Sequence, residues 1–219
     1  MTKPFTYDGE PGEIRDNIAL VQALERCAAA YRNRCFNNLD GEYPNPMWVR
    51  LYSATERLKQ AVCKNAVCRS NVARTILEIG SDLMGCDDIA VLELCGNSTL
   101  FLLAGSGMTA GREQALNANA GAIASAIETR QILIANAHMP YEQLWSELGT
   151  TAFVPVWHEG RPRGAIIFYR MLPQRNDLDL ADRELLRLLS MFSGPSLFNA
   201  LSSAAPPAPG SCADGRLEP

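Results

Sequence analysis

The sequence contains no long hydrophobic run and no surplus of charge of one sign. Its 219 residues include 20 Lys and Arg against 24 Asp and Glu, a formal net charge of −4. Nucleic-acid binding needs a surplus of basic side chains for the phosphate backbone, so nucleic acid is not expected as a partner. No uninterrupted apolar stretch of about 18 residues occurs, and a membrane partner is therefore not expected either.

The N-terminal segment also lacks the apolar core of a signal peptide, as Lys3 and Asp8 lie within it. A cytoplasmic location is therefore predicted. Seven cysteines are present, an odd number that fits poorly with a full disulfide framework. In a reducing compartment they are predicted to be free thiols.

Four of the cysteines, Cys27, Cys35, Cys63 and Cys68, lie in the N-terminal third of the chain. Four thiolates could hold zinc, but the short two-residue spacing typical of zinc sites is missing. Cys63 and Cys68 are separated by about 140° around a helix and do not share a face. The pattern favours buried core thiols and predicts no metal site, with metal binding and redox sensing left as alternatives.

Residues 1–70 are predicted to form a helical extension suited to dimerisation or partner docking. Ile14, Ile18, Val21, Leu24 and Ala28 recur at spacings of three and four and define one helix face. A turn-rich segment at 37–46 interrupts this pattern. A second helical pattern then runs over 47–84, as one long helix or two abutting ones, and ends at a glycine.

The following segment alternates strand and helix signals, and Ala- and Pro-rich residues 202–219 are predicted to be a disordered tail. The final helix contains Gly194-Pro195, which allows a kink or a break there. The predicted order is strand 88–94, strand 99–104, helix 115–129, strand 132–135, helix 141–148, strand 151–157, strand 164–169 and helix 180–201.

Several local motifs within this order resemble those of the GAF domain family. They are the glycine at 121 ahead of the helix-to-strand segment, the Val154-Pro155 pair that ends a strand, the glycines at 160 and 164, and the stretch 178–186. The resemblance covers residues 71–201. It implies an α+β fold, a GAF/PAS-like antiparallel sheet flanked by helices, with the helical extension in front.

The resemblance also implies a pocket between the sheet and the helices and loops on one face. GAF domains bind cyclic nucleotides, tetrapyrroles, haem or small metabolites, and many bind nothing known, so no cofactor is assigned. Leu178 and Arg183 depart from the cyclic-nucleotide signature and disfavour that ligand. Simple core packing of the aromatic residues and a plain surface loop at His138 are alternatives. The candidate pocket residues are Phe101, Asn136, His138, Trp145, Thr150 and Phe153.

No catalytic residue is predicted. His158 lies beside Glu159 at a hairpin tip, where exposure is expected. Some GAF proteins reduce free methionine sulfoxide with cysteines, and Cys86 and Cys95 bracket the first strand. The two ends of that strand are about 25 Å apart, so these thiols are not expected to meet.

The sequence thus predicts a non-catalytic cytoplasmic signalling or regulatory protein that senses a small molecule or relays a signal to a protein partner. A homodimer through helices 47–84 and 180–201 is expected, since symmetric dimers are the commonest oligomers. Two alternatives stay open: a ligand-free GAF scaffold, and an enzyme of the free methionine sulfoxide reductase kind.

Overall fold

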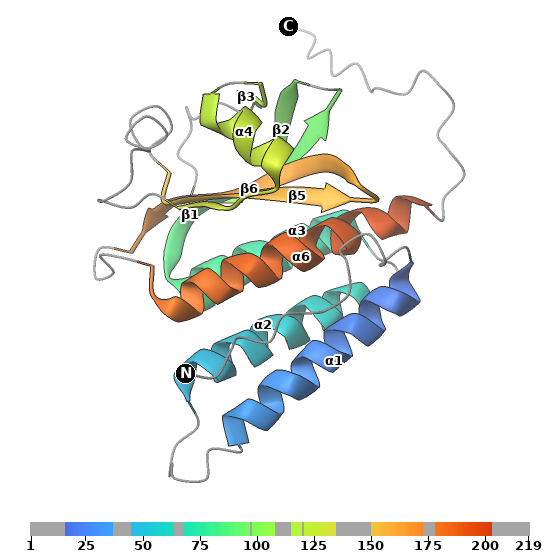
Figure 1. Ribbon diagram of the computed structural model, residues 1–219, viewed down its shortest axis with the longest axis vertical. Coiled ribbons are helices and arrows are strands. Elements are labelled where there is room, and N and C mark those ends of the chain that lie inside the picture. The colour runs from blue at the N-terminus through green and yellow to red at the C-terminus, as the bar shows by residue number, and fades with distance from the viewer. Residues whose placement is uncertain are drawn as a thin grey trace, which may run out of the picture.

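The computed structural model of the chain describes residues 16–36, 45–63, 68–96, 98–107, 115–119, 121–134, 150–172 and 178–202. In these residues a six-stranded antiparallel sheet carries helices on both faces (Figure 1). The predicted α+β fold, with a GAF-like antiparallel sheet flanked by helices, is confirmed.

Neighbouring strands of the sheet follow the order β3-β2-β1-β6-β5-β4, and every pairing is antiparallel. The strands are β1 (Cys86–Cys95), β2 (Thr99–Ser106), β3 (Ala115–Asn117), β4 (Leu133–Ile134), β5 (Ala152–His158) and β6 (Arg161–Met171). A two-residue turn joins β5 to β6. Glu159 and Gly160 have φ of 49° and 72°, as the expected tight turn requires.

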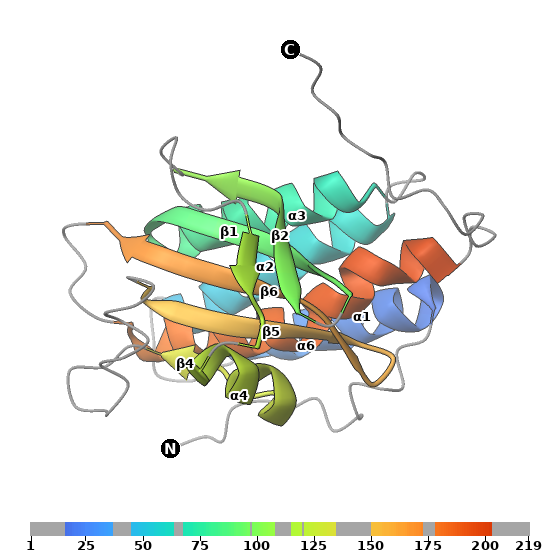
Figure 2. The same ribbon diagram turned by 90° about the horizontal axis from the view of Figure 1, so that it is seen from above.

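One face of the sheet is covered by α3 (Arg69–Glu78), its π-helical continuation η1 (Ile79–Leu83) and α6 (Leu180–Ser202). The other face is covered by α4 (Gly121–Thr129), as Figure 2 shows from above. The remaining helices, α1 (Asn17–Phe36) and α2 (Pro46–Cys63), form a helical hairpin on the far side of α6 from the sheet (Figure 1). We call this pair the α1–α2 hairpin.

The prediction of a helix over 115–129 is wrong for its first residues. Residues Ala115–Asn117 form β3, paired with the start of β2, and the helix starts at Gly121. Between them the Asn117 side-chain oxygen accepts a hydrogen bond from the backbone N–H of Asn119 at 2.9 Å. This local turn and the pairing with β2 override the helix propensity of the alanines.

The pattern over 47–84 forms separate helices, α2 and α3, and not one long helix. The last helix runs through Gly194-Pro195 without a break. The helix predicted at 141–148, Ile14 of the first predicted face, and the tail at 203–219 lie outside the described residues.

The buried face of α1 overlaps the predicted one only in part. Leu24 and Ala28 are buried as predicted, but Ile18 is 71% exposed, and Leu20 and Tyr31 are buried although they are outside the predicted set. Tyr31 stacks on Trp48 of α2 with ring centroids 6.0 Å apart. Packing against α2 therefore selects a face rotated from the one that the spacing of the aliphatic residues indicates.

Candidate functional site

The resemblance implies a ligand pocket on one face of the sheet, and α4 covers the face on which Phe153 lies. Phe153, on β5, is fully buried on this face and pairs with Leu133 of β4 and Ile167 of β6. Ile123 and Ile127 of α4 belong to the same core cluster. In the described residues, Phe153 thus packs among apolar side chains from the two neighbouring strands and one helix.

Thr150 lies immediately before β5 and is fully buried. Its hydroxyl has no hydrogen-bond partner among the residues that the structure describes. The next residue is fixed, because the Thr151 N–H donates to the Phe168 carbonyl at 2.6 Å and its hydroxyl to the Tyr169 carbonyl at 3.3 Å. Thr150 therefore supplies a buried polar group just before the start of β5. Asn136, His138 and Trp145 lie outside the described residues.

Phe101 lies on the opposite face of the sheet from Phe153. It pairs with Glu93 of β1, whose carboxylate forms an ion pair with Arg69 of α3 at 2.7 Å. Directly paired residues share a face, so Phe101 is on the α3 side. It is also 46% exposed, and it is therefore separate from the core beneath α4.

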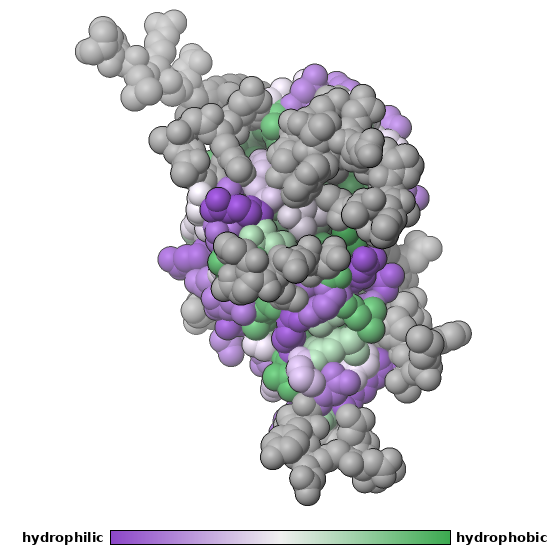
Figure 3. Space-filling model, turned by 90° about the vertical axis from the view of Figure 1, so that its left-hand side faces the viewer, coloured by the Kyte–Doolittle hydropathy of each residue, from purple (hydrophilic) through white to green (hydrophobic). Residues whose placement is uncertain are grey.

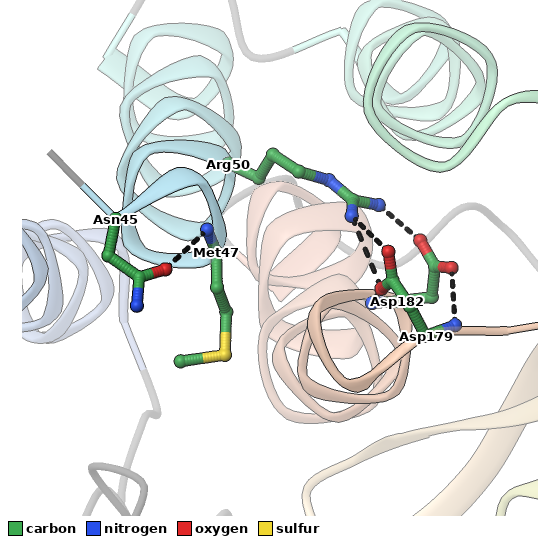
Figure 4. Close-up of polar contacts among 5 residues, drawn as sticks. All are labelled: Asn45, Met47, Arg50, Asp179 and Asp182. Carbon is green, nitrogen blue, oxygen red and sulfur yellow. Dashed lines mark hydrogen bonds and ion pairs between the residues drawn. The ribbon is translucent and has the colours of Figure 1, made fainter. Parts of the chain in front are cut away.

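A second functional feature is the contact between the α1–α2 hairpin and the start of α6. The Arg50 guanidinium of α2 donates to both carboxylate oxygens of Asp179, at 3.2 and 3.0 Å, and to the carboxylate of Asp182 (Figure 4). Asp182 is fully buried, while Asp179 is at the surface. One cation thus joins the hairpin to two carboxylates of the last helix.

The two aspartates also cap α6. The Asp182 N–H donates to the Asp179 carboxylate at 2.8 Å, and the Asp179 N–H donates to the Asp182 carboxylate at 2.9 Å. This reciprocal pair is a capping box, which satisfies N–H groups that a helix start otherwise leaves free. Burial raises the pKa of Asp182 above its ordinary value, whereas the Asp179 N–H and Arg50 favour the charged form.

Part of this contact could have been found in the sequence. Two aspartates three residues apart, just before an apolar helix, are typical of a capping box. Arg50 is 132 residues away from Asp182, and no local signal connects them. We call the three-residue contact of Arg50, Asp179 and Asp182 the Arg50 clamp.

The outer face of the α1–α2 hairpin is charged. A groove of about 610 Å³ runs between the two helices, and its charged residues are Glu25, Arg32, Glu56 and Lys59. Lys59 donates to Glu56 at 2.8 Å. From the side where α2 and α6 begin, Figure 3 shows apolar residues in small groups among polar ones. The buried side chains of α2, among them Leu51, Leu58 and Val62, belong to the same core cluster as Leu185 and Leu189 of α6.

The prediction that His158 is exposed is wrong. Its side chain is 6% exposed and stacks on Phe198 of α6, with ring centroids 6.1 Å apart. Burial lowers the pKa of His158 below its ordinary value, the neighbouring Glu159 opposes this, and Arg163 adds to it. The hairpin tip is folded down onto α6, which the sequence neighbourhood alone does not reveal.

The cysteines fall into buried and exposed groups. The prediction of buried thiols is right for Cys27 and Cys35 and wrong for Cys63 and Cys68, which are exposed. Cys86 is buried and Cys95 is exposed. Burial raises the pKa of Cys27 and of Cys86 to about 11. At the N-cap of α3, a hydrogen bond from the Ser70 hydroxyl, at 2.8 Å, lowers the pKa of Cys68. Cys86 and Cys95 stand at opposite ends of β1, as predicted.

We expect Cys68 to be alkylated first when the folded protein meets iodoacetamide near neutral pH. The thiolate is the reactive form, and Cys68 combines exposure with a lowered pKa. Cys63, also exposed, is the matched control, and Cys27 and Cys86 should react only after unfolding in urea. Peptide mass spectrometry measures the order, and labelling of Cys86 as fast as Cys68 in the folded protein would contradict it.

Within the described ranges, no group of three or more His, Cys, Asp or Glu side chains is arranged to hold a metal ion. None of the described helices has both the length and the apolar character needed to cross a membrane.

The antiparallel sheet with helices on both faces makes this an α+β domain. A sequence model of the GAF domain matches residues 69–192 of the 219, and the chain belongs to the GAF domain family. The match begins at the first residue of α3, so the α1–α2 hairpin precedes it. No curated protein matches the sequence.

The fold is similar to three solved structures with low sequence identity. The GAF domain from Acinetobacter phosphoenolpyruvate-protein phosphotransferase has 17% identity and a TM-score of 0.54, over 72% of this chain and 97% of that one. Free methionine-R-sulfoxide reductase from Neisseria meningitidis, in complex with its substrate, has 13% identity and a TM-score of 0.55, over 77% of this chain and 100% of that one. The GAF domain from a Coxiella burnetii phosphoenolpyruvate-protein phosphotransferase has 15% identity and a TM-score of 0.51, over 73% of this chain and 98% of that one. Identities this low show a shared fold.

Proposed function

We propose that this chain is a non-catalytic cytoplasmic regulatory protein. Its GAF domain senses a small molecule or relays a signal, and its output is a contact with a protein partner through the helices at 47–84 and 180–201. The observation that carries the proposal is the Arg50 clamp, which ties the α1–α2 hairpin to the helix that lies on the sheet. A change at the sheet can therefore reach the hairpin through α6.

Packing supports this route. A side-chain Cβ at Gly194 of α6 would lie 1.8 Å from the Trp157 carbonyl oxygen of β5, so helix and strand are in direct backbone contact. We propose that movement of β5, which begins just after Thr150 and contains Phe153, displaces α6 and with it the hairpin. Interiors this closely packed transmit displacements because neighbours have no room to absorb them.

Native mass spectrometry of the protein purified from its own host tests the sensing role. A bound small molecule is expected as added mass that mild heating or dilution removes. Substituting Thr150 with valine, which keeps the volume and removes the buried hydroxyl, should weaken retention of a ligand held beneath α4. A protein that carries no added mass under any growth condition would favour the ligand-free scaffold.

The second candidate, a Cys-dependent reductase of free methionine sulfoxide, is favoured by the likeness of the fold to the Neisseria enzyme. The cysteine geometry weighs against it. Such a reaction needs an attacking thiolate and a second thiol within reach. Cys86 is buried, and its thiol donates to the Arg170 carbonyl at 2.8 Å, while Cys95 is at the other end of the strand.

We expect the wild-type protein to produce no methionine from free methionine sulfoxide with dithiothreitol as reductant. The substitutions Cys86→Ser and Cys95→Ser should leave that result unchanged. Amino-acid chromatography measures the product, and a reductase of this class is the positive control. Turnover by the wild type that Cys95→Ser abolishes would replace the regulatory proposal with the enzymatic one.

A further inference from the structure

The tip of the β5–β6 hairpin buries a histidine whose ring nitrogens are both unsatisfied. His158 is 6% exposed, and neither nitrogen has a hydrogen-bond partner among the residues that the structure describes. A neutral imidazole carries one N–H donor and one acceptor, and buried groups of both kinds are nearly always hydrogen-bonded in folded proteins. This imidazole therefore needs a physical explanation.

Two guanidinium groups share an aromatic ring with this imidazole. The guanidinium carbons of Arg69, on α3, and Arg163, on β6, each lie 4.9 Å from the centre of the Phe198 ring. His158 stacks on the same ring, which belongs to the last turns of α6 (Figure 1). The two guanidinium carbons are therefore no farther apart than twice 4.9 Å. We call Arg69, His158, Arg163 and Phe198 the Phe198 cluster.

A bulge in the sheet brings Arg163 to this cluster. Pro162 and Gly164 pair with successive residues of β5, so Arg163 between them is left without a partner on that strand. An extra residue of this kind bulges the strand and re-aims its side chain. Glu93, which forms an ion pair with Arg69 at 2.7 Å, pairs directly with Gly164. Arg163 thus lies at the same face and the same position along the sheet as Arg69.

The cluster carries more positive than negative charge. Glu93 balances Arg69, whereas Arg163 has no carboxylate partner in the described ranges. Arg161 is exposed and pairs directly with His158, so its side chain lies on the same face of the hairpin. Like charges this close repel one another, and a bound anion removes the repulsion.

We propose that this end of the sheet binds a phosphate group, held by the guanidinium groups of Arg69 and Arg163 with the His158 imidazole as a further hydrogen-bond donor. Guanidinium forks match phosphate oxygens in pairs. Contacts of a cation with a ring at a partly exposed site are weak, so the forks can turn from the ring to an anion. A phosphate group also offers more acceptor oxygens than a carboxylate, which suits donors from three separate elements.

This site is distinct from the core beneath α4. Phe198 belongs to the core cluster on the α6 side of the sheet, whereas Phe153 belongs to the cluster beneath α4. A phosphate group in the Phe198 cluster contacts α3, β5 and β6 beside the end of α6. The inference goes beyond the proposed function and requires no ligand beneath α4, so its failure leaves the regulatory role untouched.

Imidazole NMR of the full chain tests the site, because the sequence contains only two histidines, His138 and His158. The signals that disappear in His158→Gln identify His158. Sodium phosphate that replaces sodium chloride at constant ionic strength should shift the His158 signals saturably and leave those of His138 in place. His158 signals that stay in place, or that move without saturating, overturn the proposal.

Arg163→Gln and Arg130→Gln are a matched pair of variants. Both remove one guanidinium near the hairpin tip, but Arg130 follows α4 and lies 4.0 Å over the ring of Trp157. Trp157 and His158 are adjacent on a strand and face opposite sides of the sheet. Phosphate binding should weaken about tenfold or more in Arg163→Gln, which loses charge-assisted hydrogen bonds, and less than about twofold in Arg130→Gln. Equal affinities in the two variants overturn the assignment to this cluster.

The pKa of His158 in the wild-type chain is a second readout that depends on no variant. Bound phosphate favours the imidazolium form, so the pKa should be higher in saturating phosphate than in chloride of equal ionic strength. An equal or lower pKa in phosphate overturns the contact with His158. The charged groups that surround the ring in the described residues are Arg69, Glu93, Glu159, Arg161 and Arg163.

Two further probes define the anion. Acetate has one charge and fewer acceptors, and it should bind at least about tenfold more weakly than phosphate. Acetate that binds as tightly as phosphate overturns the assignment to a phosphate group. Methyl phosphate distinguishes the source within a positive result: binding as tight as that of inorganic phosphate supports a phosphate monoester, and weaker binding supports the free ion.

Discussion

Replacing Arg50 with alanine is expected to lower the free energy of unfolding by about 3 to 5 kcal/mol at neutral pH, because it leaves the buried Asp182 carboxylate without its cation. Asp182 is 0% exposed, and water cannot take the place of the guanidinium. The capping box of α6 remains, but the hairpin loses its polar attachment to that helix. A loss of this size is a large fraction of the stability of an ordinary domain.

Urea unfolding followed by circular dichroism measures this loss, with Arg57→Ala as the control. Arg57 is on the same helix and contacts Asp82 at 2.7 Å, but both partners are substantially exposed. Exposed ion pairs of this kind contribute about 0 to 1 kcal/mol. Equal losses of stability in the two variants would show that the Arg50 clamp contributes no more than an exposed ion pair, despite the burial of Asp182.

The pH dependence of the same variant provides an independent check. Burial raises the pKa of Asp182, and Arg50 opposes that rise, so removing Arg50 raises the pKa further. A carboxyl group with a higher pKa in the folded than in the unfolded state penalises folding while it is charged. That penalty is present above the folded-state pKa and disappears as the pH falls through it. The difference in the free energy of unfolding between Arg50→Ala and wild type should therefore shrink as the pH falls from about 7 to about 4.

The fold was predictable where the signals are local. Glu159-Gly160 marks a two-residue turn, and Pro155 suits the outer part of β5, since among the described residues β4 pairs only with Ala152 and Phe153. Alternating strands and an amphipathic last helix followed from periodicity in the same way. The error at 115–129 arose because alanines favour a helix whereas pairing with β2 makes the first three residues a strand.

The site was less predictable because its geometry depends on register and long-range packing. The face on which Phe101 lies follows from its pairing with Glu93, on a strand whose register shifts between Val91 and Leu92. A one-residue shift of this kind moves a side chain to the other face of the sheet. The burial of His158 depends on α6, and the Arg50 clamp joins residues 129 and 132 positions apart.

Replacing Gly194 with alanine is expected to destabilise the protein by about 2 kcal/mol or more, opposite in sign to the usual effect in a helix. At an ordinary helical position this change stabilises by about 1 kcal/mol, because alanine loses less backbone entropy. Here the added Cβ would lie 1.8 Å from the Trp157 carbonyl oxygen and 2.7 Å from its carbon. Backbone atoms cannot rotate away as a side chain can, so α6 must move off β5, and overpacking of this kind costs about 1 to 3 kcal/mol or more.

Thermal unfolding of Gly194→Ala and of Ser190→Ala, in the same helix, separates the packing effect from helix propensity. Ser190→Ala should change stability by only a few tenths of a kcal/mol. If α6 connects the sheet to the hairpin, the displacement in Gly194→Ala should also accelerate hydrogen exchange in α2. A variant that is as stable as wild type, with unchanged exchange in α2, would show that the close approach of α6 to β5 is not the route by which the sheet acts on the hairpin.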